Sequence, residues 1–135
     1  RQWVQAITRS GEGRGCTVVA DQVEAGIVGF ADGGRCQGDW GYDGELYAIY
    51  LSEAHQWRGL GKALLLAVVE RLAAQGKRSL LLWVLDTNAT GRGFYEALGG
   101  VPVGEKTEEL GGATIREVAY GWPDLTELLT RTRRT

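Results

Sequence analysis

The chain has 135 residues, of which 44% are hydrophobic and 24% are charged, and its formal net charge is −2. This length suits one domain with a sizeable core and is too short for two ordinary domains. The acidic and basic residues are interspersed, which is not typical of a nucleic-acid-binding protein, and no apolar stretch reaches the roughly 20 residues of a membrane-spanning helix. We therefore expect one soluble, cytoplasmic domain, 1–135, that binds neither nucleic acid nor a membrane.

Cysteine and histidine are too few for most metal centres or catalytic triads. Cys16 and Cys36 lack the spacing of metal ligands and are expected to be reduced thiols. The single histidine, His55, lies in a predicted turn, so a zinc site or a Ser-His-Asp triad would depend on it alone. We predict no metal site.

The first residues are predicted to form the end of a helix. Trp3, Val4 and Ile7 are spaced like the apolar face of a helix that ends near Gly11. The chain starts at Arg1 and contains no Met, so we expect an upstream segment that is not in this sequence.

Two strands and a long loop follow. Residues 16–21 and 26–31 predict a hairpin with its turn at 22–25. The polar, glycine-rich stretch 31–44 contains Trp40 and Tyr42. It is predicted to be either a mobile connection or a binding lid.

The turn at 56–62 joins an apolar strand, 46–51, to an amphipathic helix that begins near Leu60 and ends at Gly76. Gly59 and Gly61 let the backbone approach a ligand closely. The first amides of the helix lack intrahelical partners, so a phosphate there gains hydrogen bonds and the favourable helix dipole. Arg58 and Lys62 add positive charge.

Two other phosphate-binding patterns do not fit this turn. A Walker loop needs Gly in place of Gln56 and a hydroxyl in place of Ala63, and a dinucleotide fingerprint needs Gly in place of Leu64. Gln-x-x-Gly-x-Gly between a strand and a helix instead resembles the acyl-CoA pyrophosphate loop of the GNAT (Gcn5-related N-acetyltransferase) superfamily.

A second segment strengthens this resemblance. After the apolar run 79–85, typical of a strand covered on both faces, the chain has Asn88 followed by 94–99, Phe-Tyr-Glu-Ala-Leu-Gly. This is similar to the family's Asn-x(6)-Tyr-Glu-x-Leu-Gly signature. Gly91 and Gly93 weaken the short helix predicted after Asn88, each by about 1 kcal/mol relative to Ala. Strands are then predicted at 101–103 and 115–122, and 123–129 predicts a short helix that covers its own sheet or reaches a partner.

The resemblance, which covers roughly 16–122, implies an α/β (α+β layered) fold with a mixed, mostly antiparallel twisted sheet flanked by helices. It also implies that the opening strand and helix segment of the family is missing here. The implied activity is that of an N-acetyltransferase, an acyltransferase that moves an acetyl group from acetyl-CoA to a primary amine of a small molecule or peptide. A homodimer is possible in this family, and a non-catalytic or regulatory CoA-binding module is the alternative.

The resemblance also implies roles for individual residues. Tyr95 would donate a proton to the departing thiolate, and Asn88 would meet the pantetheine arm while it caps a helix. Some members have an acid at the position of Trp83, so we expect Glu45 to act as general base, with Asp86 and Asp43 as alternatives. The main chain near 49–51 would pair with pantetheine. The residues predicted to bind acetyl-CoA are Ile49, Tyr50, Leu51, Gln56, Trp57, Arg58, Gly59, Leu60, Gly61, Lys62, Asn88 and Tyr95.

Overall fold

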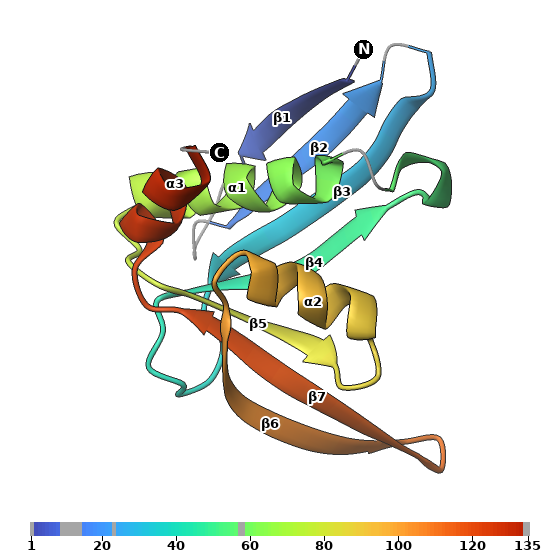
Figure 1. Ribbon diagram of the computed structural model, residues 1–135, viewed down its shortest axis with the longest axis vertical. Helices are drawn as coiled ribbons and strands as arrows, with labels where there is room; N and C mark the ends of the chain where they lie inside the picture. The colour runs from blue at the N-terminus through green and yellow to red at the C-terminus, as the bar shows by residue number, and fades with distance from the viewer. Residues whose placement is uncertain (1, 9–14, 23, 57–58, 134–135) are drawn as a thin grey trace.

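The computed structural model describes residues 2–8, 15–22, 24–56 and 59–133, and its strands form a seven-stranded sheet in the order β1-β2-β3-β4-β5-β7-β6 (Figure 1). Neighbouring strands are antiparallel except β4 and β5, which are parallel. The elements are β1 (Gln2–Thr8), β2 (Cys16–Gln22), β3 (Gly26–Arg35), β4 (Gly44–Leu51), η1 (Glu53–His55), α1 (Leu60–Ala74), β5 (Leu80–Leu85), α2 (Ala89–Ala97), β6 (Val101–Leu110), β7 (Ala113–Trp122) and α3 (Leu125–Arg133). The mixed, mostly antiparallel sheet with helices confirms the predicted fold class.

β1 replaces the helix predicted at the N-terminus, and that prediction was wrong. The strand pairs with β2 along its whole length, from Gln2 opposite Gln22 to Thr8 opposite Cys16. Seven residues are too few to separate a helical period from a strand period, and Trp, Val, Ile and Thr all favour strands. The main-chain groups of β2 also gain hydrogen-bonding partners by this pairing.

The core lies between the sheet and the helices. α1 packs across β2, β3 and β4, and its predicted apolar stripe is buried. Both α2 and α3 lie on the same side of the sheet as α1 (Figure 1), and Tyr95, Leu98, Leu125 and Leu128 join the α1 core. α3 therefore covers its own sheet, which settles one of the two alternatives for the C-terminal segment.

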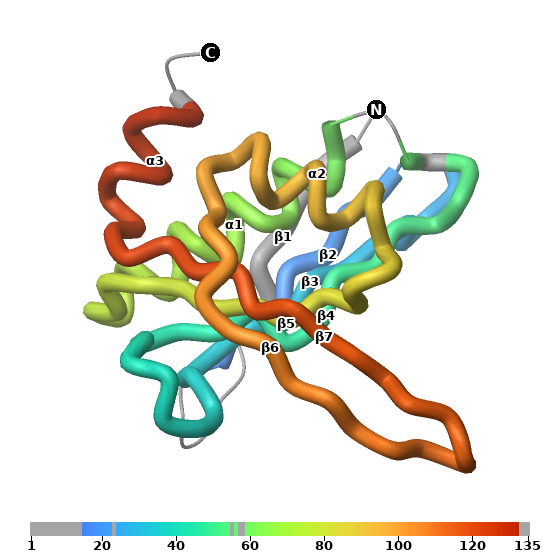
Figure 2. Tube along the Cα trace, turned by 60° about the horizontal axis from the view of Figure 1, so that its bottom comes forward, coloured from blue at the N-terminus to red at the C-terminus, as the bar shows by residue number. Residues whose placement is uncertain are grey.

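β3 and β6 extend several residues beyond their predicted ends. Residues 31–35 continue β3, because Ala31 pairs with Ile49 and Arg35 with Gly44. The predicted loop 31–44 is thus reduced to 36–43. β6 and β7 form a long hairpin that extends beyond the body of the domain (Figure 2). Its polar residues hid the strand pattern, since β6 is exposed along most of its length.

β4 and β5 are paired only where they begin. Gly44, Glu45 and Leu46 lie opposite Leu80, Leu81 and Leu82, and the pairing ends there. At this point β4 also has an extra residue, Tyr47, relative to β3. Such bulges increase local twist. In the described part of the chain, residues 48–51 therefore pair with β3 on one side and with no strand on the other.

No helix within the described ranges is long and apolar enough to cross a membrane.

Candidate functional site

A cavity of about 750 Å³ opens on the helix side of the sheet, where β4 and β5 separate. Its walls come from the end of β4, the loop before α1, the first turn of α1, and α2. The lining residues are Ile49, Leu51, Gln56, Gly59, Gly61, Lys62, Asn88, Thr90, Gly91, Phe94 and Tyr95. The fold thus brings the two sequence motifs, separated by one helix and one strand, to a single hollow.

The first turn of α1 has the features of an anion site. Gly59 precedes the helix with φ 74°, which is the left-handed conformation that glycine adopts without strain. No side chain caps the helix, and its first turn has no acidic residue but includes Lys62. A Cβ on Gly61 would lie 3.6 Å from Leu51 and 3.7 Å from Phe94, which are ordinary contacts. The absence of a side chain at Gly61 therefore widens the cavity, although the protein's own packing would tolerate a Cβ there.

The loop before α1 is tied to β4, because the Gln56 side-chain amide donates to the Leu51 carbonyl at 3.2 Å. This bond keeps the end of β4 and the glycine turn together on one wall of the cavity. Trp57 and Arg58, also predicted to bind acetyl-CoA, lie outside the described residues.

Asn88 caps α2 as predicted. Its Oδ1 accepts from the Gly91 amide at 3.0 Å. A Cβ on Gly91 would lie 2.5 Å from Asn88 Nδ2, so the capping side chain explains why this helix contains glycine. Gly93 has no such neighbour within 4 Å.

Tyr95 is the most buried polar side chain in the cavity wall, at 7% exposed. Its ring lies among Phe94, Tyr120 and Trp122, with ring centroids 5.3 to 6.2 Å away. Burial raises the pKa of this phenol, so it stays protonated at neutral pH. No described residue forms a hydrogen bond with its hydroxyl, although buried tyrosine hydroxyls usually have a partner.

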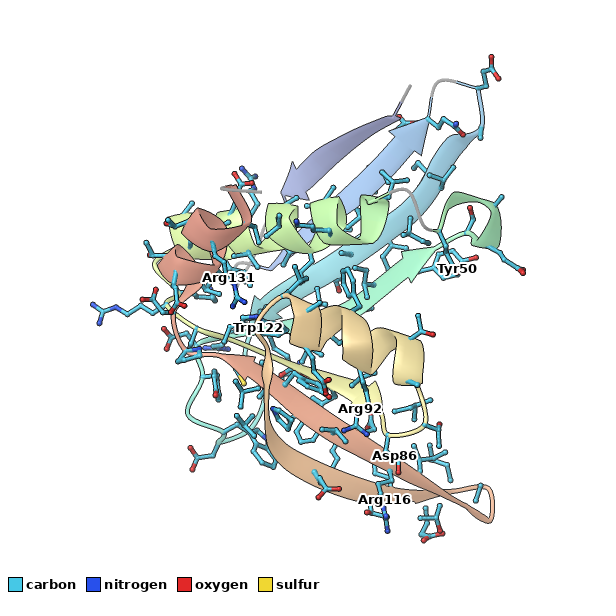
Figure 3. The ribbon with its side chains drawn as sticks, in the orientation of Figure 1. Tyr50, Asp86, Arg92, Arg116, Trp122 and Arg131 are labelled. Carbon is cyan, nitrogen blue, oxygen red and sulfur yellow. The ribbon has the colours of Figure 1, made fainter. Side chains whose placement is uncertain are left out.

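A hydrogen-bond network that the motifs did not predict holds α2 on the sheet. The buried Tyr120 hydroxyl donates to Glu96 at 2.5 Å and accepts from Arg92 Nε at 3.0 Å. Arg92 also donates to the Asp86 carbonyl at 3.2 Å, and Figure 3 shows these two residues near each other at α2. The spacing of Arg92 and Glu96 on one helix face was the only sequence signal. By anchoring α2, this network positions Tyr95.

Comparison with known proteins identifies the family of this chain. The model of the Acetyltransferase (GNAT) family matches residues 2–100. The chain belongs to the GNAT acetyltransferase family. An uncharacterised N-acetyltransferase of Bacillus subtilis, YuaI, is 41% identical over 117 residues, which are 86% of this chain and 67% of YuaI.

Solved structures of GNAT proteins have the same fold. A family member from Desulfovibrio desulfuricans superposes with a TM-score of 0.68 at 26% identity, over 82% of this chain and 69% of its own. The YncA protein of Salmonella typhimurium, solved with its cofactor acetyl-CoA, has a TM-score of 0.66 at 19% identity, over 81% of this chain and 64% of its own. The described residues contain no group of three or more His, Cys, Asp or Glu that could hold a metal ion.

Two residues predicted to bind the cofactor of this GNAT protein do not line the cavity. The Tyr50 side chain is 57% exposed and lies near Phe30, with ring centroids 6.1 Å apart, and Figure 3 shows it at the end of β4. Leu60 is buried in the core under α1. The Leu60 side chain is thus committed to the core, and the exposed Tyr50 side chain lies outside the cavity lining.

The three candidate bases occupy different surroundings, and none lines the cavity. Glu45 is 8% exposed and accepts from the Gln37 amide at 2.9 Å. Asp43 accepts from the Arg78 amide at 2.8 Å and so fastens the loop 36–43. Asp86 follows β5 and is partly exposed.

Glu45 also affects a nearby thiol. The pKa of Cys36 is raised to about 11, first by burial and then by the negative charge of Glu45. Glu45 lies beside Leu81, one residue before the last pair between β4 and β5. It is therefore the candidate base nearest, along the strands, to the point where they separate.

Proposed function

We propose that this chain is an N-acetyltransferase that transfers the acetyl group of acetyl-CoA to a primary amine of a small molecule or peptide. The observation that carries the proposal is the buried Tyr95 side chain, which lines the cavity and whose hydroxyl has no hydrogen-bonding partner among the described residues. A buried polar group of this kind is costly unless a ligand or water satisfies it. A thiolate leaving group would supply that partner.

The residues of the cavity fit acetyl-CoA. The uncapped first turn of α1, with Gly59, Gly61 and Lys62, suits the pyrophosphate. The side of β4 that faces the gap at 47–51 lacks a strand partner in the described chain, so it can accept an extended pantetheine arm as an added strand. That a solved GNAT relative holds acetyl-CoA supports this assignment.

The reaction has three requirements. A primary amine has a pKa of about 10, so it must lose a proton before its nitrogen attacks the thioester carbonyl carbon. We assign Glu45 as the base, which acts directly or through a water molecule. It lies in the part of β4 that is still paired with β5. As the carbon–sulfur bond breaks, Tyr95 gives its proton to the sulfur, and the products are an acetylated amine and CoA. The Leu51 amide is the proposed donor to the thioester oxygen.

The experiment is a thermal shift followed by an acetyl-transfer assay. We expect acetyl-CoA and CoA to raise the melting temperature, because a ligand that binds only the native state stabilises it, whereas ATP and NAD do not. Acetyl transfer is then measured with a panel of amines. A larger shift of the melting temperature with ATP or NAD would contradict the assignment. Binding of CoA without acetyl transfer to any amine would favour a non-catalytic CoA-binding module.

Two matched lysine variants refine the binding test. Lys62→Ala removes a positive charge from the cavity wall and should weaken acetyl-CoA binding. Lys77→Ala removes the same charge beyond the other end of α1, where Lys77 bonds to Gln75, and should leave the affinity unchanged.

A further inference from the structure

The sheet has an aromatic cluster on the face that the helices do not cover. Leu80, Leu82 and Val84 of β5 belong to the core under the helices, so strand alternation places Trp83 on the opposite face. There the loop 36–43 brings Trp40 edge-on to Trp83, with ring centroids 4.9 Å apart and planes at 74°. Trp40 is 40% exposed, so one indole of the pair is open to solvent.

A cation already occupies this cluster. Lys106 Nζ lies 4.4 Å from the centre of the Trp83 ring and 3.7 Å from a carboxylate oxygen of Glu117. The two charged residues are opposite each other on β6 and β7. An indole face and a carboxylate together make an ammonium site, and here the chain's own lysine fills it.

The cluster lies at the opening between β4 and β5. Leu82 is the last residue of β5 that pairs with β4, and Trp83 is the next. The cavity with Tyr95 is on the helix side of the same gap. An amine that enters the gap from the uncovered face would reach toward that cavity, while the rest of its molecule would lie along Trp83 and Trp40.

We propose that Trp83, Trp40 and Glu117 form the acceptor subsite, and that it selects acceptors with a second positive charge, such as diamines. The distal ammonium takes the place of Lys106, whose side chain is 38% exposed and can move into water while it keeps its charge hydrated. A carboxylate at that end would be repelled by Glu117 and by the negative face of the indole. That one amine of the acceptor is acetylated rests on the proposed function. The binding of the other ammonium at this site does not depend on it.

The test is an NMR titration of the indole N–H signals with three four-carbon amines that differ only in the far end: 1,4-diaminobutane, n-butylamine and 4-aminobutanoate. We expect 1,4-diaminobutane to shift the Trp40 and Trp83 signals and to bind about fivefold more tightly than n-butylamine, the size of one exposed cation–π contact. 4-Aminobutanoate should bind most weakly. Equal affinities, a preference for 4-aminobutanoate, or shifts confined to other tryptophans would overturn the proposal.

Four variants test which residues cause the preference for the diamine, and each is checked for an unchanged melting curve. Glu117→Gln and Trp83→Phe should reduce or remove the preference for the diamine, and Lys106→Gln should strengthen diamine binding by removing the competing ammonium. Glu105→Gln is the control, because it removes a carboxylate from the neighbouring, exposed position of β6, which faces the other way. If Glu105→Gln and Glu117→Gln have equal effects, the site is refuted. Absence of acetyl transfer with intact diamine binding would count against the proposed function alone.

Discussion

The ring of Tyr95 packs edge-on against the indole of Trp122, with ring centroids 6.2 Å apart and planes at 83°. The Trp122 indole N–H in turn donates to the Leu98 carbonyl at 3.1 Å. Trp122 ends β7, whereas Tyr95 lies in the last turn of α2 and Leu98 directly follows that helix. One tryptophan thus connects the proposed proton donor to the sheet.

We expect Trp122→Phe to lower both stability and turnover. The change leaves the buried Leu98 carbonyl without its donor, at a cost of about 1–3 kcal/mol, and it loosens the packing around Tyr95. Urea unfolding and steady-state kinetics measure the two effects. Turnover that is unchanged in a destabilised variant would show that Trp122 does not position Tyr95.

Tyr95→Phe should reduce turnover by about 100-fold or more, the usual size of a general-acid contribution, without loss of stability. Its hydroxyl has no hydrogen bond to a described residue, so removing it breaks no hydrogen bond within the described part of the chain. The control is Tyr120→Phe, which breaks the bonds to Glu96 and Arg92 and should cost about 1–3 kcal/mol. Equal stability losses in the two variants would contradict this difference.

Stability should fall at alkaline pH, and Tyr95 should contribute to the fall. Because burial raises its pKa, Tyr95 stays protonated in the native state at pH values where an unfolded tyrosine, with a pKa of about 10, ionises. The unfolded state then binds fewer protons, so the free energy of unfolding decreases as pH rises above that value. Urea unfolding across this range should show a shallower decrease for Tyr95→Phe than for the parent chain.

Alkylation of Cys36 reports the charge of Glu45. With its pKa raised to about 11, the thiol should react slowly with iodoacetamide at pH 8, since the thiolate is the reactive form. Glu45→Gln removes one cause of that shift and should speed the reaction. Cys16 is buried and serves as the unreactive internal reference. A rate in the parent chain like that of free cysteine would show that the Glu45 carboxylate does not face this thiol.

Two glycines in α2 should respond oppositely to alanine. Gly93→Ala has open space and should stabilise the helix by up to about 1 kcal/mol. Gly91→Ala forces Asn88 away, and loss of its cap, worth about 0.5–2 kcal/mol, cancels or exceeds that gain. Thermal unfolding of the two variants measures the difference. If both were equally stabilising, the Asn88 cap would be of no consequence.

The sequence predicted the elements whose pattern is long or regular. The α1 stripe of Leu64, Val68 and Leu72 and the unbroken apolar run of β5 left little choice of structure. β1 was misread because its seven residues fit either period, and the exposed β6 lacked an apolar face to mark it. The ends of elements were uncertain because strand pairing, which extends β3 to Arg35, is not a local property.

For the site, two motifs in the right order and spacing were enough to indicate the GNAT family, since glycines at a helix start and an Asn-Tyr pair on the next helix are local signals. The sequence by itself therefore determined the class of protein and most of the cavity wall. Only the tertiary structure decided that the Tyr95 hydroxyl has no partner in the described chain, and that Lys106, Trp83 and Glu117 meet on the uncovered face. Those contacts join residues from different strands. They depend on the strand register and on the fold of the loop 36–43, and no local sequence pattern encodes either.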